Sequence, residues 1–507
     1  IEFGADGDGA AADVARAAGD LVLRVHEELG LPRPALAFRD SADGLRATVA
    51  FPWRRRAIAQ SIGAASAHVA LGERRWEDAI RQVAAVAPGP LASVPRPRVP
   101  VVAITGTNGK TTVTRLVAHI AAGAGLRVGA TTSDGIYLRG ELVERGDWTG
   151  FGGAGRVLGD REIDLAVLET ARGGILLRGI GYARNDVSVV TNISADHLGL
   201  QGIDTLDELA DVKAALVRLT RRDGWAVLNA DDPRVWEMRH QTRARLYAFS
   251  VAGVSPEADA AVEDGGRAAV VVDGSITLRE RGRAPHRLAE LAGVPVTLAG
   301  LSTYNVSNAL AAAAAADAVG LDRDAIGSGL RSFEQDAEHN PGRLNLYRLE
   351  GRTVVIDFAH NEAGLRGLLE VCRGLAGAAK VWLGLGTAGD RSDEILRSMG
   401  VVAGTRADRV AIAEKPHYLR GRDRESMKRL FREGLAQAGI ETRAVADYPS
   451  ELETLQALVA AAAPGDVVTV MCHAERDDVA RWLEASGAAR IGARDVVAPP
   501  SDSDGAV

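Results

Sequence analysis

The chain has 507 residues, which predicts about three or four domains. Its 60 basic and 67 acidic residues give a formal charge of -7, the wrong sign for a protein that coats nucleic acid or an anionic membrane. No apolar run approaches the roughly 20 residues of a membrane span, so we expect a cytoplasmic protein. The two cysteines, Cys372 and Cys472, exclude a disulfide framework or a four-thiolate zinc site.

Residues 1–95 are predicted to form a small α+β domain without a chemical motif. An amphipathic helix is expected around Val14 to Leu29 and a short strand over Leu45 to Phe51. The segment APGPLASVPRPRVP, residues 87–100, holds five of the 18 prolines and predicts an extended linker.

The pattern changes at Val101 to short apolar runs that alternate with helical stretches. The runs VVAI, IDLAVLE, VSVVTN and WAVLN predict strands, and residues 110–122 and 206–218 predict helices. This alternation is typical of a doubly wound α/β domain with a mostly parallel sheet, which we place at 96–340. Residues 267–280 alternate around an Asp-Gly turn and predict an antiparallel β subsheet, followed by an Ala-rich helix over 304–319.

A second α/β alternation follows HNPGR at 339–343. The runs TVVIDF, KVWLGLG, DRVAIA and VVTVMC predict the strands of a C-terminal Rossmann-like α/β domain over 341–496. The polar end, 497–507, is expected to be a disordered tail.

The segment VVAITGTNGKTT, residues 101–112, places a buried strand, a glycine turn and a helix start in the order of a phosphate-binding loop. Gly106 and Gly109 let backbone N–H groups approach a polyphosphate, Lys110 reaches the β and γ phosphates, and the Thr111 hydroxyl is suited to Mg²⁺. The common pattern GxxxxGK[ST] requires a glycine at 104, where this chain has Ile104. The predicted nucleotide-binding loop comprises Gly106, Thr107, Asn108, Gly109, Lys110, Thr111 and Thr112.

Lysine is rare in this chain, because only five of the 60 basic residues are lysines. Lys213 lies in the helical run DELADVKAALV with apolar neighbours. A half-buried lysine with a lowered pKa reacts with carbon dioxide to give a carbamate, an anion suited to bridging two metals; the alternative is a helix lysine whose stem packs while its ammonium reaches water. We expect Lys380, Lys415 and Lys428 to be ordinary solvated charges.

Two predicted strands end in groups that bind metals. IDLAVLE ends at Glu169, and VSVVTN runs into TNISADH with Asp196 and His197. The carboxyl ends of neighbouring parallel strands face one crevice, so Glu169 and His197 are expected near the ion held by Thr111. Each residue alone is more often a packing or capping residue, but the shared edge favours a metal site.

The motifs TGTNGKTT, ETARGGIL, TNISADHLG, VKA, LNADDP, YNVSNALAA, NPGR and VIDFAHN resemble, in order and spacing, the Mur ligase superfamily of ATP-dependent amide-forming ligases. The resemblance covers roughly residues 100–490. ATTSDGIYL (130–138) and GDWTG (146–150) look most like the C-terminal ligase half of the cyanophycin synthetase family, although no segment is long enough for that family's ATP-grasp domain. FGGAG follows GDWTG where that family usually has a Pro and a Ser-Ala, so the acceptor end of the site is expected to differ.

The resemblance implies ATP and two Mg²⁺ ions as cofactors and Lys110, His197 and Lys213 as catalytic residues. It also implies metal binding by Thr111, Glu169, His197 and Lys213. Outside the loop it implies nucleotide contacts from Asn305 and Asn308 near the adenine, from Arg343 as a cation at the phosphates and from Asp357 at the ribose. Substrate contacts are implied for Asp134, Asp147, Thr149 and Arg172. The plain alternatives are helix-capping asparagines, a surface arginine and a strand-end aspartate.

A carboxylate is a poor electrophile, so amide formation requires one oxygen to become a leaving group. We therefore expect ATP to phosphorylate a small-molecule or peptide carboxylate, and an amine to displace the phosphate. The alternatives are a P-loop ATPase or switch and a non-catalytic ATP-binding scaffold. Candidate substrates are an Asp-containing peptide with a basic amino acid, a γ-glutamyl chain and an unrelated small acid; a homo-oligomer is compatible with the sequence.

Cys472 and His473 are adjacent strand residues that point to opposite faces, which disfavours a catalytic dyad.

Overall fold

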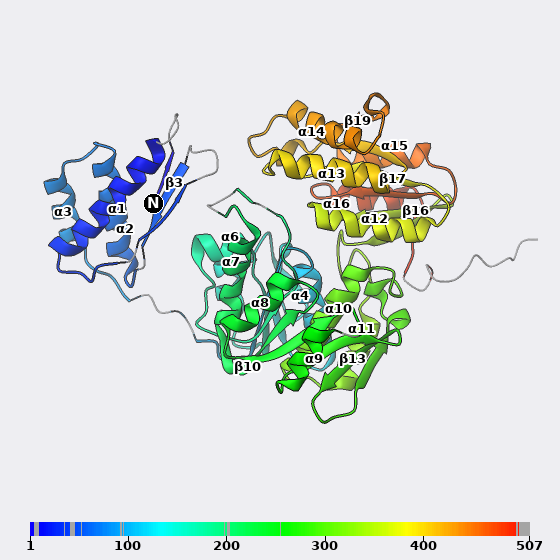
Figure 1. The fold of residues 1–507 in the computed structure, drawn as a ribbon, viewed down its shortest axis with the longest axis horizontal. Coiled ribbons are helices and arrows are strands. Elements are labelled where there is room, and N and C mark those ends of the chain that lie inside the picture. Colours follow the sequence, from blue (N-terminus) through cyan, green and yellow to red (C-terminus); the bar gives the residue numbers. More distant parts are fainter. Residues whose placement is uncertain are drawn as a thin grey trace, which may run out of the picture. The chain divides into compact units, whose positions relative to one another are not determined.

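The computed structural model describes residues 1–4, 10–34, 36–40, 46–51, 53–91, 94, 96–196, 198–199, 203–253, 255–492 and 495. The chain divides into two compact units, Ile1–Pro95 with His197–Glu208 and Arg96–Asp196 with Leu209–Val507 (Figure 1). The predicted disordered tail, 497–507, lies outside the described residues.

The first unit contains an antiparallel sheet in the order β1-β3-β2 and the helices α1, α2 and α3. The strands are β1 (Glu2–Gly4), β2 (Ala37–Asp40) and β3 (Arg46–Ala50), and the helices are α1 (Ala10–Glu28), α2 (Arg56–Ala70) and α3 (Trp76–Ala85). α1 and β3 confirm the predicted helix and strand. α2 is not predicted, because its buried face consists largely of small residues such as Ala59 and Ala65, which give a weak hydrophobic pattern.

The second unit contains an eleven-stranded sheet in the order β14-β13-β12-β11-β10-β9-β4-β8-β5-β6-β7. Its parallel strands are β4 (Val101–Thr105), β5 (Val128–Thr131), β8 (Leu165–Glu169), β9 (Asn185–Val190), β10 (Thr220–Asn229), β11 (Arg245–Ser250) and β12 (Arg267–Val272). The helices associated with it are α4 (Lys110–Gly123), α5 (Phe151–Gly159), α6 (Arg172–Arg178), α7 (Leu206–Arg218), α8 (Pro233–Glu237), α9 (Pro256–Glu263), α10 (Thr303–Ala318) and α11 (Arg323–Ser332). These strands and helices confirm the predicted doubly wound α/β class.

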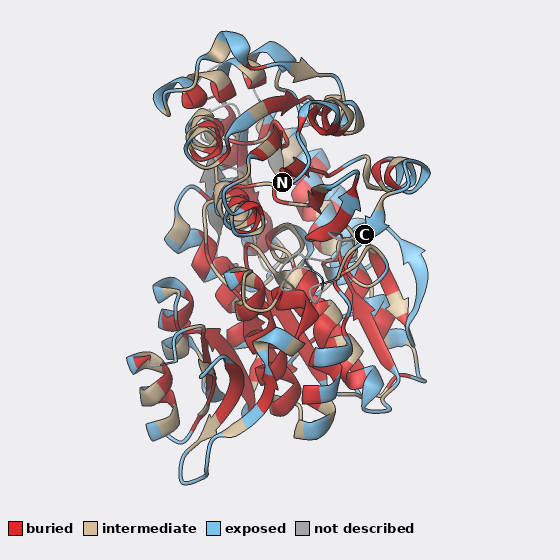
Figure 2. Ribbon diagram, turned by 90° about the vertical axis from the view of Figure 1, so that its right-hand side faces the viewer, coloured by how far each residue is buried: buried red, intermediate tan, exposed pale blue. Residues whose placement is uncertain are grey.

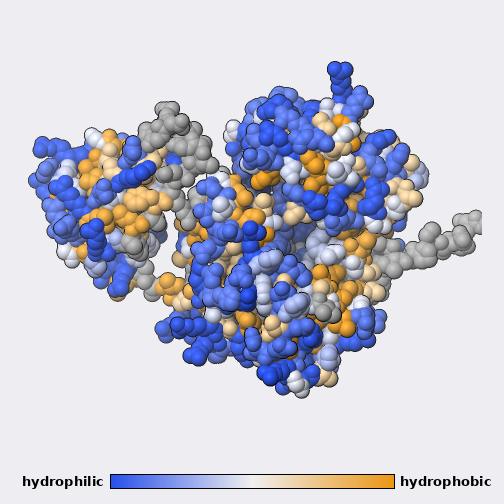
Figure 3. All heavy atoms as spheres, in the orientation of Figure 1, coloured by the Kyte–Doolittle hydropathy of each residue, from blue (hydrophilic) through white to orange (hydrophobic). Residues whose placement is uncertain are grey.

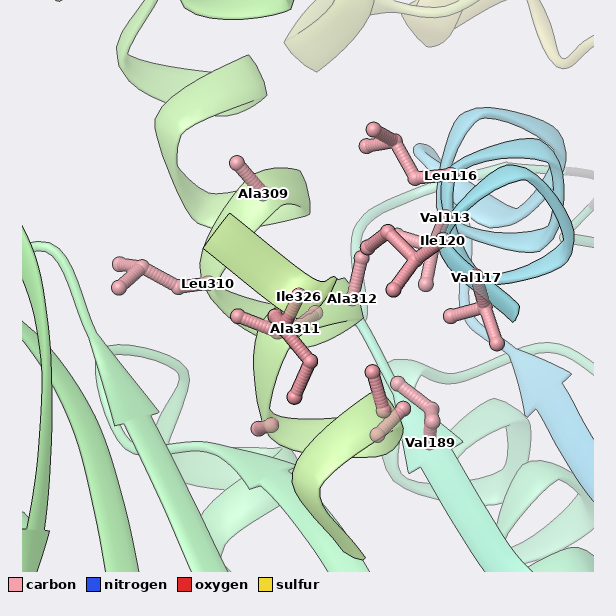
Figure 4. Packing of buried hydrophobic residues seen from close by; sticks show 14 of the residues in the cluster. Val113, Leu116, Val117, Ile120, Val189, Ala309, Leu310, Ala311, Ala312 and Ile326 are labelled. Carbon is pink, nitrogen blue, oxygen red and sulfur yellow. The ribbon is translucent and has the colours of Figure 1, made fainter. Parts of the chain in front are cut away.

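Helices cover both faces of this sheet, and the strands between them are buried (Figure 2). Alternate residues of β4 enter two different cores, with Val102 and Ile104 packing in the core of α4 and α10, and Val101 and Ala103 in the core of α5. Figure 4 shows the apolar side chains of α4 close to the alanines of α10. The alanines at 311–316 are fully buried, so α10 lies close to its neighbours. This packing fixes β4 and α4, which flank the predicted phosphate loop.

Antiparallel strands extend the sheet at both edges. They are β6 (Gly135–Leu138), β7 (Glu141–Arg145), β13 (Ser275–Glu280) and β14 (His286–Glu290). β12 and β13 pair antiparallel around Asp273 and Gly274, both with positive φ, which confirms the predicted hairpin. β6 and β7 are not predicted, and every residue of β7 is exposed, so the strand has no buried face to give an alternating pattern.

The C-terminal part of this unit has a seven-stranded sheet in the order β19-β18-β17-β20-β16-β15-β21. The strands are β15 (Asn345–Leu349), β16 (Arg352–Asp357), β17 (Val381–Leu385), β18 (Arg409–Ala413), β19 (Asp447–Tyr448), β20 (Val467–Met471) and β21 (Ala489–Arg490). The helices are α12 (Glu362–Ala376), α13 (Asp393–Arg406), α14 (Arg424–Gln437), α15 (Glu451–Ala461) and α16 (Arg476–Ala485). β16, β17, β18 and β20 confirm the predicted α/β alternation.

The face drawn in Figure 3 carries hydrophilic residues over most of its area. No helix among the described residues is long and apolar enough to cross a membrane.

A buried ion pair joins Lys415 and Glu451 at the carboxyl edge of the C-terminal sheet. Their side chains are each 2% exposed, and the Lys415 ammonium donates to the Glu451 carboxylate and to the Met471 carbonyl. The expectation that Lys415 is a solvated charge is therefore wrong, because its stem and its ammonium are enclosed by the fold. Glu451 also accepts the backbone N–H groups of His473 at 2.8 Å and Glu475 at 2.9 Å.

Cys472 and His473 use different partners beside this ion pair. The Cys472 thiol donates to Glu451 at 3.2 Å, and His473 Nε2 lies 2.7 Å from the Ala359 carbonyl. Burial and the neighbouring carboxylate of Glu451 raise the pKa of Cys472 well above its usual value, which keeps the thiol protonated. Both residues follow β20, which ends at Met471, so they are not the adjacent strand residues that the sequence predicts; their side chains nevertheless bond to different partners.

We expect Glu451→Gln to destabilise the chain by about 3–5 kcal/mol at neutral pH, because it leaves the Lys415 charge buried without its partner. Burial opposes ionisation of Glu451, but Lys415 and the backbone donors outweigh it and lower its pKa below 4.5. The ion pair therefore contributes stability at neutral pH that is lost as the pH falls below the ordinary value of 4.5 and through the folded value. Chemical denaturation at several pH values should show the difference between wild type and variant shrinking in acid.

The exposed Glu453 on the same helix provides the matched control. Glu453→Gln should change the denaturation midpoint little at either pH. An equal loss from both substitutions, or a Glu451→Gln loss that does not depend on pH, would contradict a stabilising role for the buried pair.

Candidate active site

The loop between β4 and α4 has the backbone that a phosphate-binding loop requires. Gly106 and Gly109 have φ of 148° and 85°, which L side chains rarely adopt. A Cβ at Gly106 would lie 1.8 Å from Thr191 Oγ1, and one at Gly109 would lie 2.1 Å from Asn308 Oδ1. Gly109 stands at the N-cap of α4 and has no side chain, so the first N–H groups of that helix are left for an anion.

Hydrogen bonds hold the loop in this shape. Lys110 Nζ donates to the Thr107 carbonyl at 2.8 Å, which keeps the ammonium over the loop. The backbone N–H groups of Thr107 and Asn108 each bond to Asn192 at 2.9 Å, one to its carbonyl and the other to its side chain. Asn192 follows β9, so the neighbouring strand supports the loop through these two hydrogen bonds.

Thr111 and Glu169 meet at the carboxyl ends of β4 and β8, as the sequence predicts. The Thr111 hydroxyl donates to Glu169 Oε2 at 2.9 Å, and the Ser133 backbone N–H donates to the same oxygen at 3.3 Å. Burial raises the pKa of Glu169, although the nearby charges of Lys110 and Arg343 oppose this effect. A hydroxyl and a carboxylate side by side are oxygen ligands that suit Mg²⁺, which commonly keeps several waters and takes phosphate oxygens as further ligands.

His197, the predicted ligand of the second ion, lies outside the described residues. Within the described ranges, no group of three or more His, Cys, Asp and Glu side chains is arranged to hold a metal ion. Among the described residues, the oxygen ligands beside the loop that suit Mg²⁺ are the Thr111 hydroxyl and the Glu169 carboxylate.

Lys213 lies on α7 with its ammonium against the phosphate loop. Its side chain is buried, and Nζ donates to the Gly106 carbonyl at 2.7 Å. Burial, and then repulsion from Lys110, hold the pKa of Lys213 well below its ordinary value. A larger share of neutral amine at physiological pH follows, and the neutral amine is the form that reacts with carbon dioxide.

The residues predicted to contact the nucleoside lie on two elements. Asn308 Nδ2 donates to Asn305 Oδ1 at 2.9 Å, and this buried pair on α10 adjoins Gly109. Asp357 ends β16 and accepts the backbone N–H groups of Leu344 at 2.8 Å and Ala359 at 2.7 Å. Burial raises the pKa of Asp357.

Arg343 reaches the loop from the segment that precedes β15. Its Nη2 donates to the Thr111 hydroxyl at 3.2 Å and to Ser133 Oγ at 3.3 Å. Asn340, three residues earlier, donates to the Thr112 hydroxyl at 3.3 Å. The structure thus brings Arg343 to the loop, where the sequence predicts a cation at the phosphates.

The four predicted substrate residues have different surroundings. Asp147 accepts the Thr149 hydroxyl at 2.6 Å and the Thr149 N–H at 3.1 Å, which is a local turn. Arg172 is buried at the start of α6. The Asp134 carboxylate forms ion pairs with three arginines of the chain, Arg115, Arg343 and Arg476.

Several residues near the loop are not predicted. Ser133 follows β5, and Asn361 caps α12 while its side-chain amide and that of Asn108 bond reciprocally at 3.0 and 3.2 Å. A search for the polar residue that follows each parallel strand would find Ser133. Arg115 and Arg476, which form ion pairs with Asp134, have no such signal in a chain with 55 arginines.

The chain matches two family models in sequence order. The Mur ligase middle domain matches residues 104–316, and the Mur ligase glutamate ligase domain matches 342–473. The cyanophycin synthetase of Crocosphaera subtropica is 40% identical over 362 residues, which are 71% of this chain and 40% of that protein. The UDP-N-acetylmuramoyl-L-alanyl-D-glutamate--2,6-diaminopimelate ligase of Geobacillus kaustophilus is 28% identical, covering 74% of each chain. The chain thus spans about 40% of the length of the cyanophycin synthetases it matches.

Solved structures share the fold. E. coli FolC in complex with DHPP and ADP superimposes with a TM-score of 0.57 and 20% identity, covering 77% of this chain and 90% of that one. A pseudomurein peptide ligase type C from Methanothermus fervidus gives a TM-score of 0.53 and 18% identity, covering 77% and 79%. With its two domain matches in order and the phosphate loop at the start of the first, the chain belongs to the Mur ligase family.

Proposed function

We propose that the chain is an ATP-dependent ligase that activates a carboxylate as an acyl phosphate and joins it to an amine. The observation that carries this proposal is the meeting of three groups at one sheet edge: the phosphate loop, the Thr111–Glu169 pair, and Lys213 against the loop carbonyl. An ATP-binding scaffold needs the loop alone. A buried carboxylate and a buried lysine beside the phosphates suit a site that also stabilises a reacting group.

The cofactors of this proposal are ATP and Mg²⁺, with two ions as the family resemblance implies. Thr111 and Glu169 would hold the first ion, and His197 with carbamylated Lys213 the second. When bound, the ions neutralise phosphate charge and polarise the transferring phosphoryl group. A related solved structure, a bifunctional folylpolyglutamate synthase/dihydrofolate synthase with a TM-score of 0.54, was obtained with Mn, AMPPNP and L-glutamate bound.

The residues of the chain bind and orient the nucleotide. Lys110 and the N–H groups of the loop would hold the β and γ phosphates, and Arg343 adds a second cation at the same end. Asn305 and Asn308 are proposed to contact the adenine and Asp357 the ribose. Arg172, Asp147 and Thr149 remain proposed contacts at the substrate end.

The reaction then has two balanced steps. A carboxylate oxygen of the substrate attacks the γ phosphorus, and the bond to the β-phosphate oxygen breaks, which gives an acyl phosphate and ADP. The neutral amine next attacks the acyl carbon, phosphate leaves with the bonding electrons, and the amine loses a proton. Lys110 and Arg343 counter the charge on the transferring group, and exclusion of water protects the acyl phosphate. Relatives named as an L-alanyl-D-glutamate--2,6-diaminopimelate ligase and as a pseudomurein peptide ligase favour a peptide carboxylate and an amino acid as substrates.

The test is phosphate release from Mg-ATP against a panel of amino acids and acidic peptides, with the products weighed by mass spectrometry. We expect phosphate release that depends on both an acid and an amine, and a product whose mass equals their sum minus water. Phosphate release without any amine would instead identify an ATPase or switch, and nucleotide binding without turnover would identify a scaffold.

A further inference from the structure

Asp134 lies at the centre of a group of charged side chains from distant parts of the chain. Arg115 Nη2 is 3.1 Å from Asp134 Oδ2 and Arg476 Nη1 is 3.0 Å from Oδ1, while Arg343 Nη1 is 3.7 Å from Oδ2. We name these four residues the Asp134 cluster. Asp134 lies between β5 and β6, Arg115 on α4, Arg343 before β15 and Arg476 at the start of α16. The cluster therefore connects the loop helix of the large sheet to both ends of the C-terminal region.

The carboxylate in this cluster is poorly placed to bind a substrate amine. Only 12% of the Asp134 side chain is exposed, and both of its oxygens already accept guanidinium groups. Burial opposes its ionisation, but Arg343, Arg476 and Arg115 together lower its pKa. Three cations around one anion leave a net positive charge, which repels an ammonium group and attracts phosphate.

Arg343 is the member of the Asp134 cluster that contacts the nucleotide loop. The guanidinium of Arg343 lies over the Phe358 ring with 5.1 Å to its centroid, and that of Arg476 lies over the same ring at 5.4 Å. From this position Arg343 donates to the Thr111 hydroxyl at 3.2 Å. Arg343 therefore reaches the loop from a ring that it shares with a second cation, Arg476, so its position requires a group that offsets the repulsion between the two arginines.

Arg343 and Arg476 also meet at the turn that precedes Arg343. Both donate to the Pro341 carbonyl, Arg343 at 3.0 Å and Arg476 at 3.4 Å. A Cβ at Gly342 would lie 2.6 Å from Arg476 Cδ. Two guanidiniums packed this tightly repel one another unless an anion lies between them, and Asp134 is that anion.

We propose that Asp134 is a positioning residue that holds Arg343 and Arg476 of the C-terminal region against Arg115 of α4, and so sets Arg343 at the γ-phosphate end of the loop. This inference rests on the proposed function, because it assigns Arg343 to the third phosphate. It replaces the expected substrate contact of Asp134 with a role in positioning Arg343 at the nucleotide loop.

The test compares a triphosphate with a diphosphate in the full chain. Isothermal titration calorimetry measures the dissociation constants of Mg-AMPPNP and Mg-ADP for wild type and for Asp134→Asn, which keeps the shape and removes the charge. We expect Asp134→Asn to raise the dissociation constant of AMPPNP by about 10-fold or more relative to that of ADP, because Arg343 loses its position at the third phosphate. If Asp134 had a merely structural role, its substitution would raise both dissociation constants by the same factor, and that result would overturn the proposal.

Asp164→Asn is the matched control, since Asp164 forms an exposed ion pair with Arg127 in the same sheet unit. It should leave the ratio of the two dissociation constants unchanged. Thermal unfolding of each variant reports on folding. If wild type itself binds neither nucleotide, the proposed function fails; if wild type binds both and Asp134→Asn keeps the wild-type ratio, the positioning role alone is overturned.

Arg476→Met provides a second, independent variant, and it carries the test if Asp134→Asn does not fold. Arg343 is the arginine that donates to the Thr111 hydroxyl, and Arg476 shares Asp134 and the Phe358 ring with it. We therefore expect Arg476→Met to weaken AMPPNP binding relative to ADP binding by a smaller factor, about threefold. The loss caused by Asp134→Asn should shrink in the Arg476→Met background, because one of the three repelling charges is gone. Additive effects of the two substitutions, or no change in the ratio for Arg476→Met, would contradict the coupling.

Discussion

Replacing Lys110 with alanine should reduce turnover by at least about 1,000-fold while the chain stays folded. The ammonium lies over the loop, bonded to the Thr107 carbonyl at 2.8 Å, where the phosphates of a bound nucleotide would displace that contact. In the transition state it counters the charge that develops between the β and γ phosphates. Alanine removes the charge and leaves the glycine turn and α4 in place.

The measurement is phosphate release at saturating Mg-ATP and substrates, together with thermal unfolding of the variant. Lys380→Ala is the matched control, because Lys380 is an exposed lysine of the same unit. It should behave as wild type in both assays. Turnover of Lys110→Ala within tenfold of wild type would show that the loop does not position the reacting phosphate.

The parts of the fold that the sequence predicts are those whose signal is local. Runs such as β4 are buried on both faces and therefore read as continuous apolar segments, and the turn at Asp273 and Gly274 requires the positive φ that this residue pair tolerates. β7 and α2 have no comparable signal, because the first is fully exposed and the buried face of the second has a single large apolar residue, Ile62, among alanine, glycine and serine.

The same division holds for the candidate site. The loop is a continuous segment that joins β4 to α4, so it places Thr111 of α4 at the carboxyl end of β4. Glu169 ends β8, which pairs parallel with β4, so the approach of the two residues follows from the topology. The Asp134 cluster has no local signal, since Asp134 and Arg476 are separated by 342 residues and meet only through the tertiary structure. Lys415 likewise reads as a surface cation until the fold encloses it with Glu451.

Replacing Lys213 with alanine should lower turnover by about 100- to 1,000-fold, and formate or acetate should restore part of it. The buried Lys213 ammonium is proposed to lose one proton, which its lowered pKa favours, and to become a neutral amine. The amine nitrogen then adds carbon dioxide and releases a second proton, which leaves a carbamate anion beside Gly106. Alanine leaves a cavity at the place of that anion, and a small carboxylate supplies the same charge and two oxygens. Phosphate release with increasing formate or acetate measures the recovery.

Lys213→Arg separates the carbamate from a simple loss of positive charge. Arginine keeps the cation but forms no carbamate and fills the cavity, so it should be inactive and should not respond to formate. Carbon-13 NMR of the wild-type chain in ¹³C-bicarbonate should show a carbamate carbon that both variants lack. Full activity of Lys213→Ala without any added carboxylate would refute the carbamate role, and recovery of Lys213→Arg by formate would show that the added anion acts elsewhere.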